Sequence, residues 1–128
     1  MNGLHILAEL YDCDADQPLL VDVRALSLLC RSTCAAAGLT PVAEAFHQFT
    51  NADGSQGGAT GAIVLAESHL AIHTWPELNA VTLDLYVCNF SQDNRGAAEL
   101  AFTALVQAFG ALRVVRREVL RSPKPNAQ

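Results

Sequence analysis

The chain is poor in charged and aromatic side chains. Of its 128 residues 16% are charged and 6% are aromatic, whereas 51% are hydrophobic. This length suits one domain with a modest core. Such sparse charge predicts that another subunit covers part of the apolar surface. The net charge of −5 argues against nucleic acid or an anionic membrane as a partner.

Long apolar runs and metal-binding cysteine patterns are also missing. No run of about 18 apolar residues and no basic-then-apolar N-terminus occurs, so we expect neither a transmembrane span nor a signal peptide. The four cysteines lack the paired spacing of zinc sites. Cys30 and Cys34 lie one helical turn apart, which suits thiols on a helix face better than a disulfide framework. We therefore expect a cytoplasmic protein without a bound metal.

Reactive side chains are concentrated between residues 67 and 77. This segment reads Glu-Ser-His-Leu-Ala-Ile-His-Thr-Trp-Pro-Glu. Ser68 is not in a Gly-x-Ser-x-Gly turn, and His69 and His73 lack the central glutamate of His-Glu-x-x-His, so two common hydrolase motifs are absent. The alternating run at residues 80–88 places Cys88 on the more polar face of its strand, where a thiol can meet a substrate.

The chain closely resembles the bacterial S-adenosylmethionine decarboxylase proenzymes in the strings at 67–69 and 73–77 and in the cysteine at position 88. The resemblance runs from the N-terminus and fades after about residue 94. It implies self-cleavage between residues 67 and 68, giving a beta chain (1–67) and an alpha chain (68–128). It also implies a homodimer in which two sheets pack face to face as a four-layer α/β/β/α sandwich.

The resemblance also implies roles for individual residues. Ser68 becomes a pyruvoyl group, the cofactor, which forms a Schiff base with the substrate amine. His73 matches the processing base, and Thr60 matches a position, usually serine, that assists processing. Cys88 matches the general acid that returns a proton to the α-carbon, and imidazole and thiol groups both titrate near neutral pH. Ser68 and His73 would face opposite sides of a flat strand, so we expect a kink near Ser68.

The substrate is less sharply defined. Phe49, Trp75 and Glu77 match positions that hold a nucleoside by stacking and by ribose hydrogen bonds, which favours S-adenosylmethionine and a role in spermidine synthesis. The loop at residues 51–58 is longer than the family's usual link and carries Asp53. If that carboxylate reached the pocket, L-ornithine or L-arginine would be favoured instead.

Two alternatives belong to other classes of protein. The chain could be a non-catalytic homologue that acts as a binding or regulatory subunit. It could also be a transition-metal module that uses His69, His73 and Cys88, although a fourth ligand is lacking.

Periodicity and turn residues predict an α+β fold. The expected order is strand, helix, three strands, helix, strand, within a single domain of residues 1–121. The helices are expected at 22–37, ended by Gly38, and from an N-cap at Ser91 to about Phe109. Because strands and helices do not alternate regularly, we expect a largely antiparallel sheet with helices on one face. Residues 122–128 are expected to form a disordered tail.

Overall fold

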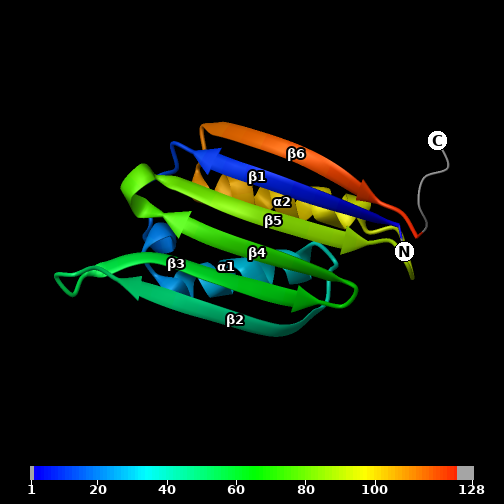
Figure 1. The fold of residues 1–128 in the computed structure, drawn as a ribbon, viewed down its shortest axis with the longest axis horizontal. Helices are drawn as coiled ribbons and strands as arrows, with labels where there is room; N and C mark the ends of the chain where they lie inside the picture. The colour runs from blue at the N-terminus through cyan, green and yellow to red at the C-terminus, as the bar shows by residue number, and fades with distance from the viewer. Residues whose placement is uncertain (1, 124–128) are drawn as a thin grey trace.

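The computed structural model of the chain describes residues 2–123, and these form one antiparallel sheet with helices behind it (Figure 1). The described strands are β1 (Gly3–Tyr11), β2 (Pro41–Thr50), β3 (Gln56–Leu65), β4 (Ser68–Trp75), β5 (Ala80–Cys88) and β6 (Arg113–Arg121). They pair in the order β2-β3-β4-β5-β1-β6, and every neighbouring pair is antiparallel. The order expected from the sequence is one strand short, because residues 68–75 form a full strand of their own.

Helices α1 (Val23–Ala36) and α2 (Arg95–Phe109) cover one face of the sheet, and short 3-10 turns occur at η1 (Pro18–Leu20) and η2 (Pro76–Leu78). The Asp22 carboxylate accepts hydrogen bonds from the backbone N–H groups of Arg24 and Ala25 in the first turn of α1, as an N-cap does. The chain leaves α1 through Gly38 at φ +94°, a conformation that favours glycine. The expected first helix is therefore confirmed to within one residue at each end. No helix within residues 2–123 is long and apolar enough to cross a membrane.

The second helix begins later than the sequence predicts. Its N-cap is Asn94 and not Ser91, and the Asp93 carboxylate accepts the backbone N–H of Arg95. The Ser91 hydroxyl instead donates to the carboxylate of Glu67 at 3.0 Å. Ser91 therefore does not cap α2, because its side chain is bonded to the turn that precedes β4. The expected tail lies outside the described residues except for Ser122 and Pro123.

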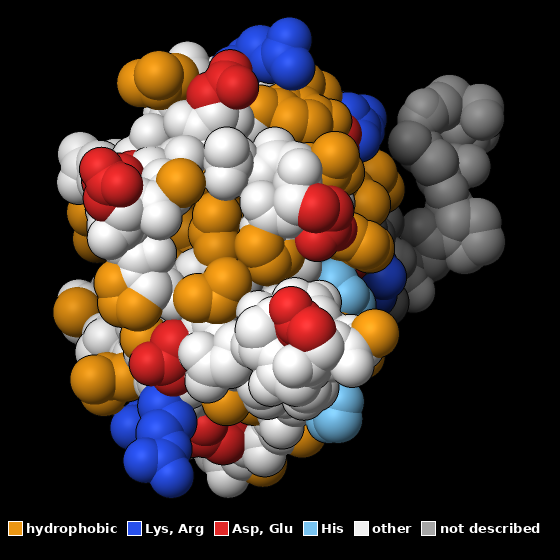
Figure 2. Space-filling model, turned by 90° about the vertical axis from the view of Figure 1, so that its left-hand side faces the viewer, with side chains coloured by type: hydrophobic (Ala, Val, Ile, Leu, Met, Phe, Trp, Pro, Cys, Tyr) orange, Lys and Arg blue, Asp and Glu red, His pale blue; other side chains and the backbone are white. Residues whose placement is uncertain are grey.

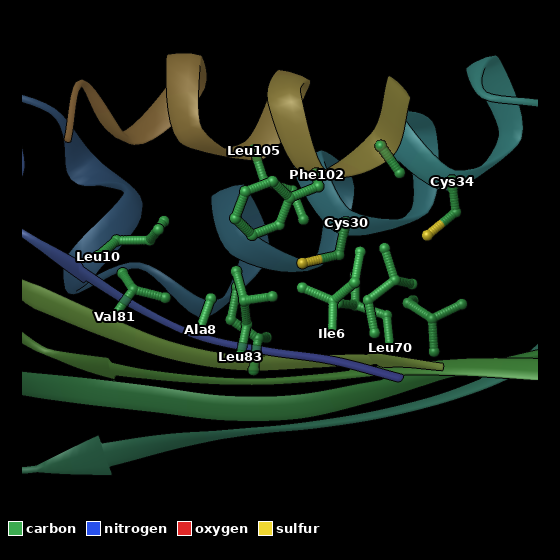
Figure 3. Packing of buried hydrophobic residues seen from close by; sticks show 14 of the residues in the cluster. Ile6, Ala8, Leu10, Cys30, Cys34, Leu70, Val81, Leu83, Phe102 and Leu105 are labelled. Carbon is green, nitrogen blue, oxygen red and sulfur yellow. The ribbon is translucent and has the colours of Figure 1, made fainter. Parts of the chain in front are cut away.

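The hydrophobic core lies between the helices and the sheet (Figure 3). Val81, Leu83, Leu85 and Val87 of β5 point into it and are each at most 3% exposed, which confirms the alternation read from the sequence. Cys30 and Cys34 of α1 lie in the same core, and burial raises the pKa of these thiols to about 12 and about 11. They are packing residues.

The opposite face of the sheet is not covered by either helix. We call it the open face. Alternation along the strands places polar and ionisable residues on it, among them His5, His69, His73, Tyr86 and Cys88. It also carries exposed apolar side chains at Phe49, Val64 and Val119. Figure 2 looks at the end of the molecule that carries the β2–β3 turn, and histidines are visible along the edge that belongs to the open face.

Candidate active site

Residues 66 and 67 form the tight turn between β3 and β4. Leu65 pairs directly with Ser68, so Ala66 and Glu67 alone connect the two strands. Glu67 has φ +66°, a left-handed conformation that is unfavourable for a residue with a side chain by about 1 kcal/mol. The break in the chain near Ser68 is therefore a hairpin turn, and its strain lies in the residue immediately before the serine.

Ser68 and Cys88 lie together at this end of β4, which we call the serine end. Ser68 is 7% exposed, and its hydroxyl oxygen lies 3.4 Å from the backbone N–H of Cys88, which donates to it. Cys88 is also 7% exposed, and its side chain is on the open face. On the outer side, the Ser91 hydroxyl donates to the Glu67 carboxylate. Hydrogen bonds thus hold the turn on both sides of the peptide bond between residues 67 and 68.

A second group of residues lies at the far end of β4, which we call the histidine end. His73, Phe49, Trp75 and Glu77 line one cavity of about 290 Å³. The His73 ring stacks on Trp75 with 4.7 Å between centroids, and it lies 5.7 Å from the ring of Phe49. The β2–β3 register shifts around Phe49, and such an irregularity re-aims a side chain. The structure thus brings together the three residues expected to bind a nucleoside and places His73 among them.

Thr60 belongs to the histidine end as well. It pairs with His73 across β3 and β4, and paired residues share a face of the sheet. Its hydroxyl donates to the carbonyl of Ile72 at 3.2 Å. A second cavity of about 220 Å³ is lined by Thr60 and His73 together with Thr82 and Asp84 of β5. The two residues expected to assist processing are therefore direct neighbours.

Three residues that are not among those expected from the sequence line the larger cavity too: Asn51, Gly57 and Gly58. A Cβ on Gly58 would lie 2.5 Å from the carbonyl oxygen of Thr74, so only glycine fits there. Adjacent glycines inside a strand often mark such a close backbone approach. That signal could have been read from the sequence.

Within one chain the serine end and the histidine end do not meet. Ser68 and His73 are five residues apart on β4, a separation of roughly 16 Å along an extended strand. The Ser68 side chain is on the helix side, with Leu70 and Thr74, whereas His73 is on the open face. The turn before Ser68 does not reverse this arrangement, so a single chain holds two incomplete halves of the expected site.

His69 directly follows Ser68 on β4, but its side chain is on the open face. Its ring is 5.4 Å from Tyr86 and 6.2 Å from His5. Burial, followed by the charges of His5 and Arg121, lowers the pKa of His69. Among residues 2–123 no three histidine, cysteine, aspartate or glutamate side chains are placed to hold a metal ion. The alternative of a metal module at His69, His73 and Cys88 is therefore not supported.

The loop that carries Asp53 is shorter than the sequence suggests. Strand β2 continues to Thr50 and β3 begins at Gln56, so the turn consists of residues 51–55. The exposed Asp53 carboxylate accepts hydrogen bonds from the N–H and hydroxyl of Ser55 at 2.9 and 2.5 Å, and these lower the pKa of Asp53. Asp53 is not among the residues that line the cavity. The geometric reason to expect a basic amino acid as substrate is thus absent.

These features define an α+β protein in which a strained hairpin turn precedes a buried serine and an aromatic cavity lies on the same strand. Residues 4–122 match the family model of S-adenosylmethionine decarboxylase, and the chain belongs to this family. The match continues well beyond residue 94, where the resemblance in the sequence fades. The chain is therefore a member of a family of decarboxylating enzymes, the carboxy-lyases, as the segment at 67–77 indicates.

Individual relatives agree with this assignment. The chain is 36% identical over 119 residues to an S-adenosylmethionine decarboxylase proenzyme of Carboxydothermus hydrogenoformans, covering 93% of this chain and 85% of that protein. It is 43% identical over 86 residues to the proenzyme of Aquifex aeolicus, covering 67% and 58%. The crystal structure of an adenosylmethionine decarboxylase from Aquifex aeolicus superposes with a TM-score of 0.78 at 31% identity, covering 97% and 96%. The expected α+β fold is thus confirmed.

Proposed function

We propose that the chain is a cytoplasmic, self-processing decarboxylase of S-adenosylmethionine that supplies the aminopropyl donor for spermidine synthesis. Its single domain, residues 1–121, would be cut between residues 67 and 68 into the beta chain 1–67 and the alpha chain 68–128. The observation that carries the proposal is the turn: a glutamate at φ +66° immediately precedes a buried serine hydroxyl. Strain at this position favours a reaction that opens the peptide bond.

The cleavage can be written with Glu67 and Ser68 of the serine end and with His73 and Thr60 of the histidine end. The Ser68 hydroxyl oxygen attacks the carbonyl carbon of Glu67, and the C–N bond breaks as the nitrogen gains a proton, which leaves an ester. Removal of the Ser68 α-proton then breaks the bond between the Ser68 β-carbon and the ester oxygen. The chain 1–67 leaves with a main-chain carboxylate at Glu67. Water replaces the nitrogen of the resulting dehydroalanine, and ammonia leaves. His73 would take the α-proton, with Thr60 beside it.

The residues present fit a pyruvoyl group at position 68. Ser68 begins a strand that is paired on both sides, so the new end of the alpha chain stays anchored between β3 and β5 after cleavage. When formed, the group supplies an electron-withdrawing carbonyl beside which an α-amino acid loses carbon dioxide. Cys88 lies next to this position and would give a proton to the substrate α-carbon.

The histidine end fits the nucleoside part of S-adenosylmethionine. Phe49 and Trp75 offer aromatic faces for the adenine and the sulfonium, and Glu77 offers acceptors for the ribose hydroxyls. No comparable carboxylate for the side chain of L-ornithine or L-arginine comes from Asp53, whose hydrogen bonds go to Ser55 in the exposed turn. We therefore favour the small-molecule substrate S-adenosylmethionine over the basic amino acids and over a non-catalytic role.

Because the two ends do not meet in one chain, we propose a homodimer of the two-chain unit. Packing the open faces together would cover Phe49, Val64 and Val119 and would give the four-layer α/β/β/α sandwich. A two-fold axis places residue i of one chain against residue j of its partner, and residue j against residue i. The serine end of each chain could thereby meet the histidine end of the other.

Intact mass tests the proposal most directly. The purified protein should resolve into residues 1–67 and 68–128, and the second piece should be about 17 Da lighter than a chain with a free serine, because one molecule of ammonia is lost. Labelled carbon dioxide should then be released from carboxyl-labelled S-adenosylmethionine and not from ornithine or arginine. A single uncut mass after long incubation would overturn the proposed function.

A further inference from the structure

A row of three paired residues crosses the sheet beside the serine end. Gly3 of β1 pairs with Cys88 of β5 on one side and with Arg121 of β6 on the other. Because Gly3 has no side chain, the ring of Tyr86 occupies the space above it. A Cβ on Gly3 would lie 2.6 Å from the Tyr86 hydroxyl oxygen. The phenol of Tyr86 therefore lies over the β1 backbone, in the row that carries Cys88 and Arg121.

The neighbours of Tyr86 hold its ring in this position above Gly3. Tyr86 is 8% exposed, and the guanidinium carbon of Arg121 lies 4.5 Å from the centroid of its ring. His5 of β1 and His69 of β4 face the same ring at 5.9 and 5.4 Å. Burial, followed by the influence of the neighbouring Cys88 thiol, raises the pKa of Tyr86. The hydroxyl thus keeps its proton at neutral pH and can act as a donor.

The geometry points to Tyr86 as a positioning residue for the Cys88 thiol, a role that rests on the proposed function. In turnover the Cys88 S–H bond breaks as its proton passes to the substrate α-carbon, and a thiolate remains. The Tyr86 hydroxyl donates a hydrogen bond to this sulfur, and Arg121 holds the ring in place. A hydrogen bond to a charged acceptor is among the stronger ones in proteins, so it favours proton release from the thiol.

The same hydrogen bond favours transfer of the Cys88 proton to the substrate α-carbon. If a proton reached the carbon derived from Ser68 instead of the substrate α-carbon, hydrolysis by water would release an aldehyde and leave alanine at the start of the alpha chain. That exchange moves the substrate nitrogen onto the protein and ends activity. A thiol held by Tyr86 in one orientation disfavours this outcome.

The first test uses uncut protein, so it does not depend on the proposed function. In a Ser68→Ala background, the pH dependence of Cys88 alkylation by iodoacetamide is followed by peptide mass. Tyr86→Phe keeps the ring and removes the hydroxyl, and it should raise the alkylation midpoint by about one pH unit. His5, His69, Asp84 and Arg121 remain in place, so their titration is common to both proteins. An unchanged midpoint would overturn the inference.

Tyr11→Phe is the matched control. Tyr11 pairs with Arg113 at the other end of the β1–β6 ladder, and the Arg113 guanidinium lies 4.7 Å from its ring centroid, so it repeats the arrangement of Tyr86 and Arg121. This variant should leave the Cys88 midpoint where it is. An equal shift in both variants would show a general effect on the sheet and would refute the specific role of Tyr86.

The second test follows the alpha chain of processed protein by mass during turnover with S-adenosylmethionine. Tyr86→Phe should cleave itself normally but accumulate the alanine-ended chain about tenfold faster per turnover than Tyr11→Phe. Gly3→Ala, which would push the ring off β1, should reproduce the effect. An alpha chain of Tyr86→Phe that survives as many turnovers as the parent would refute the second role. If no chain is ever cut, the proposed function fails, while the alkylation test still decides the contact.

Discussion

The two ends of β4 differ in burial, in backbone strain and in the kind of side chain that they carry. At the serine end, Ser68 and Cys88 are each 7% exposed, and the turn before them is strained and held by hydrogen bonds. At the histidine end, Phe49 is 42% exposed, and aromatic rings surround a cavity of about 290 Å³. The first arrangement suits a reaction on the chain itself, and the second suits reversible binding of a flat ligand.

This difference explains why neither end is a complete site. His73, which would take the α-proton, lies roughly 16 Å from Ser68 along the same strand and on the other face. The groups that would bind substrate line the same cavity as His73. A strand cannot bend back over such a distance without losing its pairing with β3 and β5. In the proposed homodimer, a second copy of the chain would offer the missing half without any distortion. Each end can therefore be inactivated separately by mutation.

The largest effect is expected when the serine end is inactivated in one chain and the histidine end is inactivated in its partner. Ser68→Ala should leave one uncut chain, and His73→Ala should stall at the ester, which hydroxylamine would cleave. When the two variants are co-expressed, the intact histidine end of the Ser68→Ala chain should cut the His73→Ala chain. Intact mass would show residues 1–67 appearing in the mixture and in neither variant alone.

A control defines what this experiment can exclude. A chain that carries both Ser68→Ala and His73→Ala, co-expressed with His73→Ala, offers no intact histidine end and should give no cleavage. If mixed Ser68→Ala and His73→Ala dimers form, as separate affinity tags would show, and still stay uncut, the two ends do not act across the interface.

Much of the serine end could be read from the sequence. The alternation of β5 places Cys88 on the face of the sheet that points away from the core. Ser68 and His73 are five residues apart, so they cannot share a face of one strand. The role of Ser91 could not be read, because its hydrogen-bond acceptor is 24 residues away. A serine before a helical pattern looks locally like an N-cap.

The row of Cys88, Gly3 and Arg121 could not be predicted from the sequence. It exists because β1 inserts between β5 and β6, and no local pattern encodes the order of strands in a sheet. The turn at Asp53 is shorter than the sequence predicts for a related reason. Gln56, Gly57 and Gly58 look like loop residues, but pairing with β2 and close packing on Thr74 place them in a strand.

The next largest effect is expected at Cys88. Cys88→Ser should allow self-cleavage, because the backbone N–H that contacts Ser68 is retained. Turnover should fall about 100-fold, since a hydroxyl is a much poorer proton donor near neutral pH than a thiol. Release of labelled carbon dioxide per cut chain measures this. Wild-type turnover in Cys88→Ser would reduce Cys88 to a packing residue.

A smaller effect is expected in the β2–β3 hairpin, where replacement of Phe49 and replacement of Asp53 should have different results. Phe49→Ala should raise the KM for S-adenosylmethionine about tenfold by removing an aromatic face of the cavity, with little change in self-cleavage. Asp53→Ala is the control from the same hairpin, and it should leave KM unchanged because its carboxylate is exposed and bonded to Ser55. The reverse result, with only Asp53→Ala affected, would restore a basic amino acid as the substrate.

The smallest expected effect concerns the outer side of the turn. Ser91→Ala removes the hydroxyl that donates to Glu67, and an exposed hydrogen bond to a carboxylate contributes about 1 kcal/mol to holding the strained conformation. Self-cleavage should therefore slow about fivefold, as measured by the appearance of residues 1–67 over time, while the final extent of cleavage is unchanged. Ser55→Ala breaks an equivalent serine–carboxylate hydrogen bond in the other hairpin turn and should leave the cleavage rate unchanged. Equal rates in Ser91→Ala and Ser55→Ala would show that the Ser91 hydroxyl does not help to hold the left-handed conformation of Glu67.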